Sequence, residues 1–433
     1  MNNTIAKIYN KIFDNDFCEN TSLIFLLFFT GLINSRRHIA MFKIPFLEVI
    51  IILIFGLLFV LNILMIIFKC FIYKESPYVT DKYWKPLIII ILLKYIIIFS
   101  QILYSFLINK LTSDVQTLSL AANYPINSHV NNLIKFIINF TMIAILTTRI
   151  DNFCKLNLSI SAFGLGCAIA PIIGLIFFPN LIGRRISDVN GIFFAGSFWN
   201  ASVIAFVSSG WLLISTLKNI EKPFGKFINL FLAVIMFVGG IAGLSRAIVV
   251  SGFISMLIYA ICLKDIKKLF KIIAILIILV LIIQSQFGII FENFKLRLQK
   301  KGDIRNEGRI KIWKDYLEDI KTFFILGEPV EGYKVFSKTG KGPHSILLNW
   351  WSQFGVFAVL AFIWFMWGVW KSASYIYKNM TIQQGAAIFA WLFGYLSLAM
   401  INETGYRELP FYAAMGIIFA WGNLVKRKTT MAN

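Results

Sequence analysis

Charged residues are scarce in this chain. They occupy 15% of its 433 positions, whereas soluble globular domains carry about a quarter. Hydrophobic residues make up 58% of the sequence, so an ordinary soluble globule is excluded. The apolar runs reach the roughly 20 residues that a helix needs to cross a bilayer, and they lack the strict alternation of a porin strand. We therefore expect an all-α fold, a polytopic bundle of membrane helices.

Cysteine and histidine are also rare, with five and three copies. The cysteines fall in predicted spans or cytoplasmic segments, so neither a disulfide framework nor a cysteine-rich metal site is expected. His38, His129 and His344 are too scattered in the sequence to form a metal site without help from carboxylates. We expect neither a bound metal nor another cofactor.

Acidic residues number 21 against 42 lysines and arginines, which leaves a formal net charge of +21. The basic residues are spread between spans rather than gathered with aromatic residues on a soluble domain, so nucleic acid is not an expected partner. Retention of positive charge in cytoplasmic loops and attraction to anionic membrane lipids account for the excess.

Hydropathy predicts about twelve membrane spans. Lysine and arginine follow every second span, which places both termini in the cytoplasm. Arg36 and Arg37 are the exception, because this topology puts them outside. The polar start of the chain has no small-residue cleavage site, so the first span is expected to remain. The predicted spans are 21–35, 44–68, 86–107, 131–148, 156–178, 192–216, 227–243, 247–263, 268–290, 345–370, 383–401 and 409–425.

One long polar loop divides the chain. About nine spans over 1–290 precede it, the loop occupies 291–344 on the outer side, and 345–433 contains the remaining spans and a cytoplasmic tail. Basic residues outnumber acidic ones in the loop, and anionic phosphate is the partner that this excess suggests. Apolar residues at helical spacing from Ile312 to Phe324 predict an amphipathic helix that lies on the membrane surface or caps the bundle.

Three residues on the predicted outer side can each be interpreted in two ways, as part of a functional site or as an ordinary polar residue near the membrane surface. Arg309 lies in the first turn of the predicted amphipathic helix, where backbone N–H groups and the helix dipole favour an anion; it could equally be a solvated loop cation. Arg246 lies in a short turn between two spans, where a charge is costly enough to suggest function, although its side chain could snorkel to the interface. His344 begins a span, where the helix N-terminus favours a neutral ring that can accept a proton; otherwise it is an interfacial polar cap. Together the three fit group transfer from a diphosphate, with the arginines holding the leaving group and the histidine acting as the base.

The order of these motifs resembles a known family. Gly-Leu-Ser-Arg at 243–246 is followed by Gly-Arg at 308–309 with Trp313 shortly after, then by Gly-Pro-His-Ser at 342–345 with Gly355 ten residues further on. This pattern resembles the O-antigen ligase and O-antigen polymerase superfamily of bacterial inner-membrane proteins. It implies a twelve-span helical fold with a large periplasmic loop before the tenth span. It also implies that a glycan is transferred from undecaprenyl diphosphate, without a metal or a nucleotide sugar.

The resemblance also implies roles for single residues. Arg246 and Arg309 would contact the donor diphosphate, and His344 would be the catalytic base. The expected further substrate contacts are Arg184, Arg185 and Arg305. The chain departs from the family pattern at Ser345, where the family usually has Asn, and at Ala358, where Gly, Thr or Tyr is common.

Ligases and polymerases of this superfamily differ in the acceptor. A ligase joins the glycan to a sugar of the lipid A core, whereas a polymerase joins it to another lipid-linked repeat and could work with a chain-length regulator. The spacing from His344 to Gly355 is more similar to the ligases, so we favour that reaction, at the periplasmic face of the inner membrane. A lipid-linked oligosaccharide flippase is the alternative from another class, but the sequence shows no internal repeat of the kind that transporters commonly have.

Overall fold

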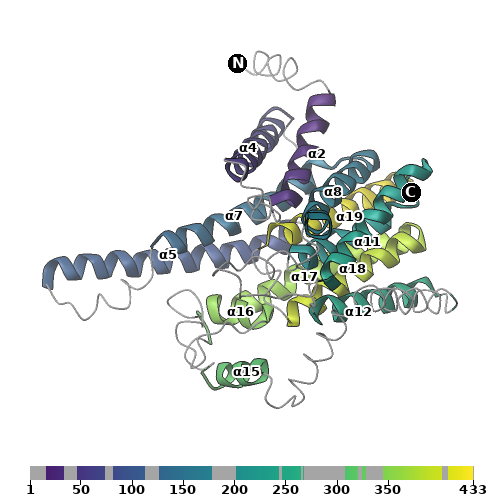
Figure 1. Ribbon diagram of the computed structural model, residues 1–433. Helices are drawn as coiled ribbons and strands as arrows, with labels where there is room; N and C mark the ends of the chain where they lie inside the picture. Colours follow the sequence, from purple (N-terminus) through teal and green to yellow (C-terminus); the bar gives the residue numbers. More distant parts are fainter. Residues whose placement is uncertain are drawn as a thin grey trace.

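The computed structural model is helical throughout the part of the chain that it describes, and no strand occurs there, which confirms the all-α prediction. It describes residues 16–33, 46–73, 81–112, 126–177, 201–242, 246–264, 267, 308–319, 324–327, 345–401 and 408–432. The elements are α2 (Asp16–Ile33), α4 (Leu47–Tyr73), α5 (Asp81–Thr112), α7 (Ile126–Arg149), α8 (Phe153–Phe177), the π-helix η3 (Phe206–Gly210), α10 (Trp211–Thr216), α11 (Pro223–Ala242), α12 (Arg246–Leu263), α15 (Gly308–Asp319), α16 (Ile346–Phe354), α17 (Val356–Asn379), α18 (Ile382–Ile401) and α19 (Leu409–Ala432) (Figure 1).

Eight of the described helices are long and apolar enough to cross a membrane, and these lie in α4, α5, α7, α8, α11, α17, α18 and α19. Three shorter apolar helices, Asn20–Ile33, Ala201–Thr216 and Ile248–Leu263, coincide with three more predicted spans. The predicted span 268–290 lies outside the described residues. The chain is therefore a multi-pass helical membrane protein.

The predicted span 345–370 is wrong as a single helix. The structure divides it into α16 and α17, which meet at Gly355. The backbone of Gly355 has φ +79° and ψ −177°, a conformation that is essentially restricted to glycine. Hydropathy could not detect this break, because both helices are apolar.

Glycines allow close packing between several helices. A Cβ atom added to Gly166 of α8 would lie 2.0 Å from the carbonyl oxygen of Phe28 in α2, so the two backbones are nearly in contact there. On α11, a Cβ at Gly239 would meet Pro171 at 2.7 Å, and one at Gly240 would meet Ile248 at 2.8 Å. Gly239 and Gly240 therefore allow α11 to pack closely against other helices of the same chain.

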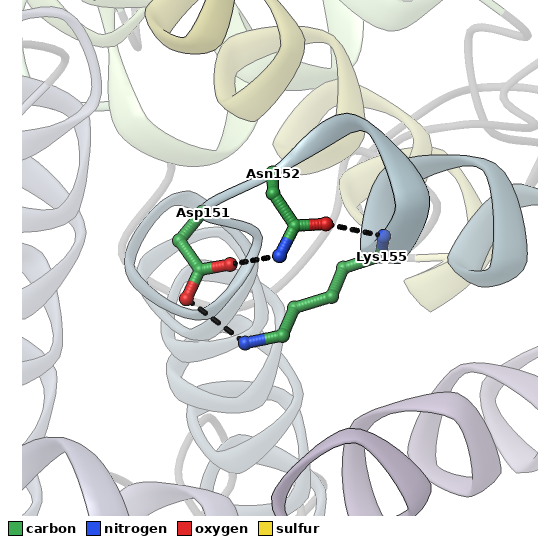
Figure 2. A network of polar contacts seen from close by, with 3 residues as sticks. All are labelled: Asp151, Asn152 and Lys155. Atoms are coloured by element: carbon green, nitrogen blue, oxygen red, sulfur yellow. Dashed lines mark hydrogen bonds and ion pairs between the residues drawn. The ribbon is translucent and has the colours of Figure 1, made fainter. Parts of the chain in front are cut away.

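A compact polar turn joins α7 to α8 (Figure 2). Asn152 caps α8, because its Oδ1 atom accepts a hydrogen bond of 2.8 Å from the backbone N–H of Lys155. The amide of Asn152 donates to Asp151, and Lys155 Nζ forms an ion pair with Asp151 at 2.9 Å. These local bonds stabilise the short connection between two long helices.

Hydrogen bonds bring this turn together with other basic connections. Asn219, between α10 and α11, donates to Asn157 of α8 at 3.2 Å, and Gln384 of α18 donates to Asn219 at 2.9 Å. Tyr377, near the end of α17, donates to the carbonyl oxygen of Cys262, near the end of α12, at 2.9 Å. We call this part of the bundle the basic end; the lysines near these contacts are Lys155, Lys218, Lys222, Lys264 and Lys378.

The start of α5 does not lie with these connections. A Cβ at Gly368, in the middle of α17, would lie 2.4 Å from the ring of Tyr83. Trp364 of α17 also donates from its indole N–H to the carbonyl oxygen of Lys82 at 3.0 Å. Helix α5 is therefore shifted along α17, and its Lys94 reaches the opposite end of that helix.

Candidate functional site

The predicted site residues belong to elements at the end of the bundle opposite the basic end, which we call the far end. Helix α12 finishes at the basic end, so Arg246, its first residue, begins at the far end. Helix α12 packs closely along α18, since a Cβ added to Gly394 of α18 would lie 2.1 Å from Oγ of Ser255 in α12. Helix α17 also finishes at the basic end, so α16, which precedes it, lies at the far end.

Helix α16 begins directly behind the predicted base. His344 itself lies outside the described residues, and Ser345 follows it as the N-cap of α16 in an extended conformation. Ser345 is buried, and its carbonyl oxygen accepts the first helical hydrogen bond from the N–H of Asn349 at 2.9 Å. Ser352 donates from Oγ to the carbonyl oxygen of Asn349. The helix thus has a buried polar side that begins at the residue after His344.

Aromatic packing holds α16 in place. Trp350 is fully buried, and its ring lies 5.7 Å from that of Phe136 in α7 and 5.7 Å from that of Phe362 in α17. Phe354, at the other end of α16, packs against Phe136 and also against Tyr95 of α5. Contacts with three helices, α5, α7 and α17, therefore hold α16 in the bundle.

Helix α15 confirms the predicted amphipathic helix from Ile312 to Asp319, and it lies at the edge of the bundle (Figure 1). The hydroxyl of Tyr316, a fully buried residue, donates to the carbonyl oxygen of Leu348 in α16 at 2.9 Å. Ile312, one turn earlier, is also buried. Arg309 precedes Ile312 by three positions and Tyr316 by seven, so its position falls on the same helix face. Of the two predicted placements for this helix, the structure supports capping of the bundle.

A turn at residues 324–327 closes over the break between α16 and α17. The carbonyl oxygen of Phe324 accepts hydrogen bonds from the N–H of Val356 at 2.9 Å and from the indole N–H of Trp351 at 3.1 Å. A Cβ at Gly355 would lie only 1.8 Å from the carbonyl oxygen of Ile325. Both its φ angle and this close approach require glycine, which gives a physical reason for the glycine of the motif. Phe324 therefore lies in this turn rather than in the amphipathic helix.

Gly355→Ala is expected to destabilise the protein, because it adds a Cβ where the conformation alone costs about 1–3 kcal/mol and where a backbone atom is in the way. The measurement is the thermal unfolding temperature of purified protein in detergent. Gly56→Ala is the matched control, since a Cβ there meets nothing within 4 Å and alanine is the better helix former. Equal unfolding temperatures for the two variants would contradict the expected steric conflict between a Cβ at position 355 and the turn at residues 324–327.

The structure leaves part of the predicted site untested. The backbones of Arg246 and Arg309 are described as helix starts, whereas His344, Arg184, Arg185 and Arg305 lie outside the described residues. Within the described ranges, no group of three or more His, Cys, Asp or Glu residues could hold a metal ion.

One buried charge at this end of the bundle is not among the predicted site residues. Lys94 is a lysine inside the apolar helix α5 and is 6% exposed. Charge within a membrane span is a signal of function in general, and that signal could have identified it.

Residues 231–363 match the family model Wzy_C, described as O-antigen ligase. This stretch is therefore similar to the O-antigen ligase family. The O-antigen ligase match begins within α11 and includes the rest of that helix, α12, α15, α16 and the start of α17, and Arg246, Arg309, His344 and Gly355 all lie within it. Arg184 and Arg185 lie outside the match. No curated protein matches the chain.

Proposed function

We propose that the protein transfers a glycan from undecaprenyl diphosphate to a sugar hydroxyl at the periplasmic face of the bacterial inner membrane. The observation that carries the proposal is the position of the O-antigen ligase motifs: α12 and α16 both begin at the far end, and α15 packs on α16. Positive charge is retained in cytoplasmic loops, so the basic end would face the cytoplasm and the far end the periplasm.

The chemistry needs one base and a stabilised leaving group. His344 accepts the proton of the acceptor hydroxyl while its oxygen bonds to the anomeric carbon of the donor sugar. The bond between that carbon and the diphosphate oxygen breaks, and undecaprenyl diphosphate leaves with the bonding electron pair. Arg246 and Arg309 neutralise the charge that develops on the diphosphate, because planar guanidinium groups bind its oxygens in pairs. Arg184, Arg185 and Arg305 would provide further contacts to the donor.

Lipid A core is the acceptor that we propose, so the reaction is that of a ligase. The spacing between His344 and Gly355 and the O-antigen ligase match support this choice. The test offers purified protein the lipid-linked donor together with lipid A core. Glycan attached to lipid A core supports the ligase. Longer lipid-linked chains with no such product would identify a polymerase, and movement of the donor across a vesicle membrane without any glycan joined would identify a flippase.

Transfer is expected to continue unchanged in excess EDTA and without ATP. The donor contains its own diphosphate leaving group, and arginines provide the positive charge that a divalent ion supplies in many glycosyltransferases. The measurement is product formation by purified protein before and after chelation. Loss of activity in EDTA with recovery in Mg²⁺ or Mn²⁺ would contradict this and would point to acidic residues as metal ligands. The candidates are Asp303, Glu307, Glu403 and Glu408.

A further inference from the structure

A buried lysine contacts the turn that covers the break between α16 and α17. Lys94 Nζ donates to the carbonyl oxygen of Leu326 at 2.7 Å and to that of Gly327 at 3.4 Å. The side chain is 6% exposed and belongs to an apolar stretch of α5. Burial of an ammonium group is expensive unless it is compensated by hydrogen bonds, so these carbonyl groups account for part of its retention there.

The turn and helix α5 both contact the α16–α17 break. Gly327 has φ +71°, and a Cβ added there would lie 2.5 Å from the carbonyl carbon of Gln353 in α16. Tyr95, the neighbour of Lys94, packs its ring 6.2 Å from that of Phe354. Four segments therefore meet at one point, which we call the junction: α5 at Lys94 and Tyr95, residues 324–327, the end of α16 and the start of α17.

A small movement at the junction has a large effect at the other end of α16. Nine residues form this helix, so it is about 13 Å long. A tilt of about 10° at the junction would move its first residue by about 2 Å, and misplacement of a catalytic group by about 1 Å can cost about 100-fold in rate. His344 is bonded directly to Ser345, the N-cap of α16.

We infer that Lys94 is a positioning residue for glycan transfer: by binding the carbonyl groups of residues 326 and 327 it holds the turn against the α16–α17 break and so sets the direction of α16 and the place of His344. The inference rests on the proposed function. It assigns Lys94 a role through its hydrogen bonds to the backbone of residues 326 and 327 and no contact with the substrate.

The test combines kinetics with a cross-link that does not depend on activity. Lys94→Met keeps the apolar stem and removes the ammonium group. We expect kcat to fall by about 100-fold, with KM for the lipid-linked donor changed by less than about threefold. In the cross-link, benzoylphenylalanine replaces Phe324, whose ring lies 5.4 Å from that of Trp351. It should join the peptide that contains Trp351 in protein with Lys94 and lose that product in Lys94→Met.

Two further variants keep the result interpretable. Lys85→Met removes an exposed lysine from the same helix and should leave both kcat and the cross-link unchanged. Trp351→Phe keeps a ring but removes one hydrogen bond to Phe324, and we expect a smaller loss in kcat in the same direction. This variant keeps Lys94 and its hydrogen bonds to residues 326 and 327, so it tests the turn even if Lys94→Met does not fold.

Each other outcome overturns the inference. Lys94 does not hold the turn if Lys94→Met keeps the cross-link. It does not position the base if kcat is retained, and it binds the donor directly if KM rises while kcat is unchanged. If unaltered protein transfers no glycan, the proposed function fails, whereas the cross-link still decides whether Lys94 holds the turn.

Discussion

His344→Ala is expected to abolish glycan transfer while the protein remains in the membrane in normal amount. Loss of a general base costs on the order of 100- to 10,000-fold in rate. Histidine is rare in this chain, with three copies, and His344 is the copy within the O-antigen ligase match, one residue before Ser345, the N-cap of α16. The measurement is product formation from the lipid-linked donor at saturating acceptor, together with the thermal unfolding temperature of the same preparation.

His38→Ala provides the matched control for this experiment. It removes a histidine that belongs to none of the motifs and lies outside the O-antigen ligase match, so transfer should be unchanged. Surface glycan at a near-normal level from a well-expressed His344→Ala variant would remove this histidine from the mechanism. The remaining interpretation would then be a polar cap at the membrane interface.

Arg246→Lys and Arg309→Lys should each lose most or all of their activity. Lysine retains the charge but cannot reproduce the planar, paired hydrogen bonds of a guanidinium group to phosphate oxygens. Arg246 is the first residue of α12 and Arg309 is the second residue of α15, and backbone N–H groups at a helix N-terminus also favour an anion. If both bind one diphosphate, the losses should not add in the double variant, because groups that act as a unit are not independent.

The comparison needs rates for both single variants, the double variant and a control. Arg427→Lys is suitable as the control, since Arg427 lies in the last turns of α19, outside the O-antigen ligase match, and it should keep full activity. If a lysine variant retains full activity with purified donor, that arginine does not bind the diphosphate through paired hydrogen bonds and is only a charge at the membrane interface. Losses that add fully in the double variant would mean that the two arginines act on different groups.

The class of the protein could be predicted from composition and motif order. Scarce charge and long apolar runs identify membrane helices. Each residue of a span adds its own free energy of transfer into lipid, so the sum can be read from the sequence. The motifs around Arg246, Arg309, His344 and Gly355 could be recognised for a similar reason: each is a short stretch of consecutive residues. The family match over 231–363 confirms the predicted resemblance, and the roles of these residues stay predictions.

The arrangement of the site depended on contacts that no local pattern reports. Gly355 appeared in the motif without a reason, and only its φ angle and its approach to Ile325 show why a predicted single span is two helices. The amphipathic helix was predicted, but its bond to α16 through Tyr316 joins residues 32 positions apart. The charge of Lys94 in an apolar run is visible in the sequence, but its partner, Leu326, is 232 positions away and only the structure identifies it. Hydropathy and spacing are properties of neighbours in the chain, so they determined which helices form and which residues resemble a site, whereas packing between distant segments decided how those helices meet.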